Sequence, residues 1–191
     1  MAYAFVAIVF GGLVGLALGG RLRNLGEHRL AAWPLLPAGV VLQLLSGAAR
    51  NHADVALALL LASYVALGAF AAANARVLGM ALVGAGLAAN LLVIAVNQGM
   101  PVRRQAAIDA GIARSSAELD AINLKTKHHY ERPSDDLMFL ADVIPVRPLR
   151  EVLSLGDAVM SVGIAAVVAA LLRREPAHPQ PEPTGSLPSE G

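Results

Sequence analysis

Five apolar segments, each about as long as a bilayer-crossing helix, constrain this chain more than any other feature. Four of them carry no charged residue, and the fifth carries only Asp157. Backbone groups in hydrocarbon must be hydrogen-bonded internally, so each segment is predicted to be a helix. The predicted spans are residues 2–20, 30–49, 55–73, 77–96 and 152–172.

The composition supports lipid as the solvent. Charged residues make up 15% of the chain, whereas soluble domains carry about 25%. The net charge of +1 argues against a nucleic-acid partner, and the absence of cysteine excludes disulfides and thiolate sites. We therefore predict an all-α membrane bundle of about five transmembrane helices in one domain, residues 1–175. The proline-rich tail, residues 176–191, is predicted to be disordered.

Small and polar residues inside the spans indicate helix packing. Gly11, Gly15 and Gly19 are spaced by four. They form a helix-packing face, or their spacing simply reflects the abundance of small residues in this chain. Gln43 and Asn90 are expected to make interhelical hydrogen bonds. The first span lacks a basic start and is too long for an ordinary signal peptide, so it is expected to be retained.

The distribution of arginine predicts the orientation, because cytoplasmic loops are enriched in basic residues. Arginines gather after the first, third and fifth predicted spans, in segments that lie on the same side of the membrane. They are Arg21, Arg23, Arg29, Arg76, Arg173 and Arg174. This places the N-terminus outside and the C-terminus inside a bacterial inner membrane. The 98–151 loop then lies outside, although it holds eight basic and eight acidic residues.

The 98–151 loop is predicted to be structured. Residues 102–110 have helical composition and end at Gly111, and the spacing of Ser115 and Glu118 predicts a capped helix over 117–124. The apolar stretch 137–145 is too short to span and is expected to be interfacial or re-entrant.

The polar stretch 125–132 contains Lys127, His128 and His129. A solvated interfacial turn is favoured over contact with a lipid headgroup, and both are favoured over a metal site, because adjacent histidines point to different faces of regular structure. No metal and no cofactor is expected.

Asp157 opens the last span and has two readings. With Ser154 it matches a capping box at the positive end of the helix dipole, and this reading is favoured. Alternatively, Asp157 and Asp142 form a catalytic pair, since two close carboxylates can divide the acid and base roles as in aspartic proteases.

Several motifs together resemble a family of small bacterial membrane proteins known as domain of unknown function number 5317. They are Asn97-Gln98-Gly99-Met100-Pro101-Val102, Ala107 with Gly111, Lys127-His128, Leu140-Ala141-Asp142-Val143-Ile144-Pro145 and Ser154-Leu155-Gly156-Asp157. The family has glycine at the positions of Gln98 and Ala141. The side chains that stand there in this chain reduce the freedom of the backbone. The resemblance covers the chain except the tail and implies membrane location without an activity.

The last two motifs also resemble the end of lipoprotein signal peptidase, an intramembrane aspartyl protease. That resemblance implies Asp142 and Asp157 as catalytic residues. The Gly-Asn-x-x-Asp-Arg stretch of that family is missing, and its Asn-x-Gly-Ala-Ala-Phe loop is matched only by Asn97 and Gly99.

Three functions follow as hypotheses. The first is a non-enzymatic membrane protein that binds a lipid, a membrane-protein partner or a second copy through its outer loop, with Asn97, Gly99, Lys127 and His128 as binding residues. The second is an aspartyl hydrolase using Asp142 and Asp157. The third is a small transporter or channel subunit, because polar residues within spans often mark a path. The polar residues in the spans are Gln43, Asn90 and Asp157, with Ser46, Ser63 and Tyr64 as weaker additions.

Overall fold

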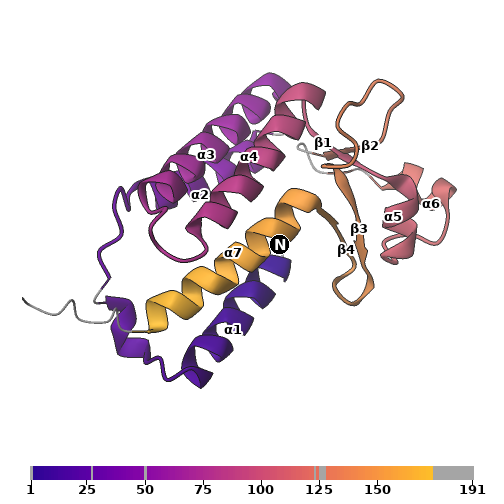
Figure 1. Cartoon of the computed structure of the whole chain (residues 1–191). Coiled ribbons are helices and arrows are strands. Elements are labelled where there is room, and N and C mark those ends of the chain that lie inside the picture. Colours follow the sequence, from indigo (N-terminus) through magenta and orange to yellow (C-terminus); the bar gives the residue numbers. More distant parts are fainter. Residues whose placement is uncertain (1, 27, 50, 123, 125–127, 174–191) are drawn as a thin grey trace, which may run out of the picture.

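The computed structural model describes residues 2–26, 28–49, 51–122, 124 and 128–173. Long helices lie side by side, and a small sheet with two short helices covers one end of them (Figure 1). The tail predicted to be disordered lies outside the described residues.

Five longer helices form the body of the protein: α1 (Ala2–Ala17), α2 (Leu35–Ala48), α3 (Ala53–Ala73), α4 (Met80–Asn97) and α7 (Leu155–Leu172). The most extensive contacts join α2 to α3, α3 to α4, α4 to α7 and α7 to α1, so the helices form a row. Tyr3 reaches Asp157 at one end of α1, and the amide of Arg21 donates to the carbonyl of Leu172 at the other. Helices α1 and α7 therefore run parallel.

Among the described residues, α3, α4 and α7 are long and apolar enough to cross a membrane. Helices α1 and α2 are apolar but have only 16 and 14 residues, so five helices of spanning length are not confirmed. The second segment is shortened because residues 31–34 form a turn, with Ala32 at φ 50° and Pro34 preceding the helix. The first ends before Gly19, whose φ is 85°.

The prediction of an all-α fold is wrong in the segment between α4 and α7. Four short strands pair there in the order β2-β1-β3-β4. Strand β1 is parallel to both of its neighbours, and β3 is antiparallel to β4. The strands are β1 (Met100–Val102), β2 (His128–Tyr130), β3 (Asp142–Val146) and β4 (Glu151–Ser154). Strands of three to five residues are too short to give a reliable alternation in sequence, and the pairing partners are distant.

Short helices connect these strands: α5 (Arg104–Asp109) and α6 (Ser116–Ala121) lie between β1 and β2, and η2 (Arg147–Leu149) lies between β3 and β4. A further short helix, η1 (Leu22–Gly26), lies between α1 and α2. The two predicted loop helices are confirmed. Helix α5 starts two residues later than predicted, and α6 ends three residues earlier. Gly111 follows α5 at φ 75°, and the Ser115 hydroxyl caps α6 by accepting from the amide of Glu118. Residues 142–146 form a strand, so the re-entrant interpretation of 137–145 is wrong for them.

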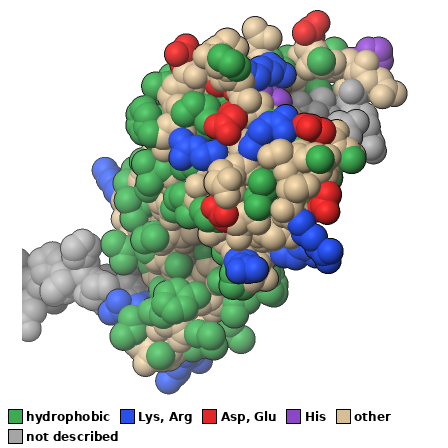
Figure 2. Space-filling model, turned by 90° about the vertical axis from the view of Figure 1, so that its right-hand side faces the viewer, with side chains coloured by type: hydrophobic (Ala, Val, Ile, Leu, Met, Phe, Trp, Pro, Cys, Tyr) green, Lys and Arg blue, Asp and Glu red, His purple; other side chains and the backbone are tan. Residues whose placement is uncertain are grey.

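The two parts of the molecule present different surfaces. Figure 2 shows charged side chains of both signs over the sheet end and hydrophobic side chains over the lower part of the same face. Large apolar side chains are exposed along the helices, including Phe5, Phe10, Leu13, Leu44 and Val162. Such exposure suits contact with lipid rather than water.

Candidate functional site

A cavity of about 550 Å³ lies where the helices meet the sheet, and we call it the chamber. Its polar lining comes from both parts of the molecule: Tyr3, Tyr64, Asn90, His128, Asp142, Arg150, Glu151 and Asp157. Its apolar lining includes Ile94, Met100, Val102 and Val152. A cavity of this size with a few convergent polar groups is typical of a small-molecule site.

The β3–β4 pairing brings both aspartates to the chamber wall. Asp142 pairs with Ser154, with one extra residue on β3 between Asp142 and Ile144. Ser154 is the N-cap of α7, and Asp157 follows three residues later. The two carboxylates, fifteen positions apart in sequence, therefore line one cavity.

Asp157 is held by its own helix start, which confirms the predicted capping box. Its amide donates to the Ser154 hydroxyl at 2.8 Å, and the Ser154 amide donates back to the carboxylate at 3.4 Å. The carboxylate also lies at the positive end of the helix dipole. The capping contacts leave the Asp157 side chain on the chamber wall.

Two other helices donate to the same carboxylate oxygen of Asp157. The side-chain amide of Asn90 donates at 2.8 Å, and the hydroxyl of Tyr3 donates at 3.1 Å. The Ser154 hydroxyl donates to the Asn90 carbonyl at 2.9 Å. The interhelical hydrogen bond predicted for Asn90 is therefore confirmed.

Gly156 makes this network sterically feasible. A β-carbon at Gly156 would collide with the side-chain oxygen of Asn90 and approach the Gly86 carbonyl to 2.8 Å. The missing side chain lets α4 and α7 come close enough for Asn90 to reach Asp157. Gly11 and Gly15 have the same role between α1 and α7, whereas Gly19 faces open space. The glycine face is thus confirmed for two of its three members.

Asp142 is buried, with only 5% of its surface exposed. It faces His128, with 3.5 Å between the imidazole Nε2 and the carboxylate. The next residue, His129, instead lies 3.2 Å from Asp135. Adjacent histidines thus point to different partners, as predicted. Residues 128–130 form strand β2, so the prediction of a solvated turn is wrong for these three residues.

Glu151 anchors the start of α1 beside the chamber. Its carboxylate accepts from the amide of Ala2 at 3.0 Å and from the amide of Tyr3 at 3.4 Å. Burial raises the pKa of Glu151, but donors at the start of α1 outweigh it and hold this pKa below its usual value. The contact fixes Tyr3 where its hydroxyl meets Asp157.

Of the four predicted binding residues, the structure places His128 on the chamber. Asn97 instead joins α4 to the following loop, donating to the Asp136 carbonyl at 2.9 Å and accepting from its amide at 2.8 Å. Gly99, at φ 153°, is buried in the turn into β1. Lys127 lies outside the described residues.

Sequence reasoning missed Tyr3 and Glu151 and gave Tyr64 only minor weight. A hydroxyl in an apolar segment was the available signal for both tyrosines, because polar groups in spans are commonly functional. Nothing local marks Glu151, which acts through a contact about 150 positions away. Within the described ranges, no group of three or more histidine and carboxylate side chains is placed to hold a metal ion.

Comparison with protein families gives one match: residues 27–169 match a family of unknown function, DUF5317. Because the match covers well over half of the chain, the chain belongs to this family. No curated protein and no solved structure matches it.

Proposed function

We propose that this member of the DUF5317 family is a membrane protein that binds the amine-bearing polar head of a lipid-like amphiphile in the chamber. The observation that carries the proposal is the position of the chamber, between apolar helices and a polar sheet. A molecule bound there has its polar part at the membrane surface.

The charges around the chamber favour a cation. Asp142 and Asp157 contribute two negative charges and Arg150 contributes one positive charge, so these side chains carry −1 with His128 neutral. The carboxylate of Glu151 also lines the chamber but is already held by donors at the start of α1. Charge complementarity selects binding partners, and a partly buried setting strengthens it. An ammonium group also donates several hydrogen bonds, which suits carboxylate and tyrosine oxygens.

The orientation predicted from arginine supports the same setting. Helix α4 leads directly into β1 and β4 leads directly into α7, so the sheet side of the row holds the chamber. The connections on the opposite side carry Arg21, Arg23, Arg29 and Arg76. We propose that this opposite side is cytoplasmic and that the chamber opens on the outer leaflet.

Binding of a short-chain lipid tests the proposal. The probes are dihexanoyl phosphatidylethanolamine and dihexanoyl phosphatidylglycerol, added to the purified full chain in a nonionic detergent and followed by calorimetry. The ethanolamine probe is expected to bind more tightly, by about tenfold for one charge-assisted hydrogen bond. Asp142→Asn is expected to remove that preference, and Asp109→Asn, an exposed α5 residue with the same change of charge, to retain it.

Equal binding of the two probes by the unmodified chain would reject the amine-binding proposal. Retention of the preference in Asp142→Asn would do the same, because the chamber would then not be the binding site. A protein that binds neither probe but elutes with a stable protein partner would instead favour a protein-docking role.

A second candidate is hydrolysis, favoured by the two aspartates on one cavity wall. Three donors orient Asp157, while Asp142 faces His128, so Asp142 would be the member of the pair that exchanges a proton. The test is release of product from a lipid-modified peptide or a phospholipid by the full chain in liposomes. Turnover that is lost in both Asp142→Asn and Asp157→Asn supports this candidate, and turnover that survives either substitution contradicts it.

A further inference from the structure

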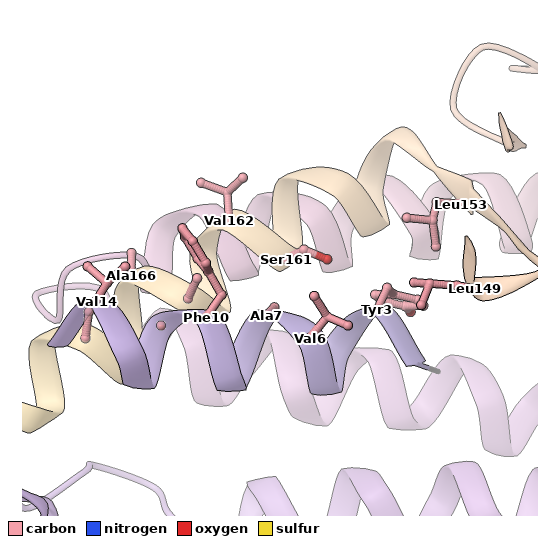
Figure 3. Close-up of a pocket in the computed structure, with 13 residues that line it drawn as sticks. Tyr3, Val6, Ala7, Phe10, Val14, Leu149, Leu153, Ser161, Val162 and Ala166 are labelled. Atoms are coloured by element: carbon pink, nitrogen blue, oxygen red, sulfur yellow. The ribbon is translucent and has the colours of Figure 1, made fainter. Parts of the chain in front are cut away.

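A second cavity, of about 530 Å³, runs between α1 and α7, and we call it the groove. Figure 3 shows side chains of both helices along it, with Tyr3, Leu149 and Leu153 at one end and Val14 and Ala166 at the other. The groove follows the helices, whereas the chamber lies at their ends.

The groove offers an apolar surface. Apart from Tyr3 and Ser161, its lining consists of glycine, alanine, valine, leucine and phenylalanine. The Ser161 hydroxyl donates to the Asp157 carbonyl within α7 at 2.7 Å, and the Tyr3 hydroxyl donates to the Asp157 carboxylate. Both polar side chains thus have partners inside the protein, so the groove suits hydrocarbon.

The length of the groove matches one leaflet. Tyr3 and Val14 are 11 positions apart on α1, which is about 16 Å along a helix. This is roughly half of the ~30 Å hydrocarbon thickness. The groove begins at the chamber, so it covers the leaflet next to the sheet. An alkyl chain of a lipid has this reach, whereas a helix of a second copy would cross both leaflets.

Tyr3 joins the two cavities, because it lines both of them. Strand β4 lies between the two cavities, with Leu153 lining the groove and Val152 lining the chamber. A molecule with its polar head against Asp157 therefore has its apolar part beside the ring of Tyr3, where the groove begins.

We infer that the groove binds an alkyl chain of the same amphiphile whose amine-bearing head occupies the chamber. The substrate class is thus an amine lipid of the leaflet next to the sheet, held at both its head and its tail. This inference rests on the proposed function and adds the binding site of the tail.

Chain length and a groove-filling substitution test the inference. The probes are lysophosphatidylethanolamines with hexanoyl and myristoyl chains, titrated into the full chain in nanodiscs of phosphatidylcholine. The altered position is Val162, which lines the groove and is 62% exposed. Val162→Trp fills space between α1 and α7, and the matched control Val41→Trp adds the same side chain on the exposed face of α2.

The unmodified chain is expected to bind the myristoyl probe more tightly by tenfold or more, since the longer chain places more methylene groups in the groove. Val162→Trp is expected to reduce myristoyl affinity toward the hexanoyl value, and Val41→Trp to leave the difference intact. The control removes the effect of chain length on partition into the bilayer. If Val162→Trp does not fold, Val6→Trp on α1 tests the same groove.

The inference is overturned if Val162→Trp and Val41→Trp respond alike to chain length. In that case, retained selectivity for the ethanolamine head leaves the proposed function standing. Loss of head selectivity in the unmodified chain overturns both. A groove substitution that lowers the oligomeric state of the chain, measured by light scattering, without changing chain-length dependence assigns the groove to a second copy instead.

Discussion

The side-chain amide of Asn90 on α4 donates a 2.8 Å hydrogen bond to the carboxylate of Asp157 on α7, across 67 positions of sequence. Asn90 is exposed to only 1% and Asp157 to 9%. Since Asn90 also accepts from the Ser154 hydroxyl, one side chain orients both residues of the α7 cap. The row of helices and the chamber thus share one polar network.

Removal of that network is expected to destabilise the protein. Asn90→Leu keeps a similar volume, but the Ser154 hydroxyl loses its acceptor and the Asp157 carboxylate loses one donor. We expect a loss of about 1–3 kcal/mol in the free energy of unfolding. Denaturant titration in detergent measures it. Asn51→Ala, at an exposed position between α2 and α3, is the control. An Asn90 variant as stable as the control would contradict the role assigned here.

Two glycines on α4 are expected to respond differently to alanine. A β-carbon at Gly86 would collide with the Gly156 carbonyl and come within 2.8 Å of Met160. Gly86→Ala should therefore cost about 1–3 kcal/mol of unfolding free energy. At Gly84 the nearest atom is the Ala71 side chain at 3.6 Å, so Gly84→Ala should be neutral or stabilise by about 0.5–1 kcal/mol.

The same denaturant titration compares these two variants. Equal losses of unfolding free energy at Gly84 and Gly86 would mean that α4 is equally sensitive on both faces. That result would contradict a particular role for the close contact between Gly86 and α7. A loss confined to Gly86 confirms close packing between α4 and α7.

Acid is expected to loosen the start of α1 through Glu151. Its folded-state pKa lies below the usual 4.5, so the contribution to stability is present above about pH 4.5 and is lost as the pH falls through the folded pKa. The melting temperature in detergent should fall with acid more in the unmodified chain than in Glu151→Gln. A difference between the two proteins that stays constant from pH 7 to pH 3 would exclude this linkage.

The proposed orientation predicts which surface cysteines can be labelled. The chain has no cysteine, so single substitutions report cleanly. Ser115→Cys, before α6, should react in intact cells with a membrane-impermeant maleimide, and Leu78→Cys, between α3 and α4, should react only after permeabilisation. The reverse pattern would invert the topology and place the chamber on the cytoplasmic side.

Local sequence signals predicted several parts of the structure correctly. The cap formed by Ser154 and Asp157, the stop at Gly111 and the packing role of Gly11 and Gly15 depend on residues close in sequence. Such features follow from spacing alone, because a helix start or a helix face is defined within one or two turns. The apolar segments were identified as helices for the same reason.

The tertiary structure decided what these segments build together. Strands of three to five residues acquire their structure from partners such as Asp142 and Ser154, which pair only after the segment between α4 and α7 folds back. Tyr3 and Glu151 become part of the site through contacts spanning about 150 positions. The sequence by itself determined apolar helices with defined ends, since those depend on local hydrogen bonding and hydrophobicity. Only the tertiary structure placed Asp142, Asp157, Asn90 and Tyr3 around one cavity, because their meeting depends on long-range packing that no local pattern encodes.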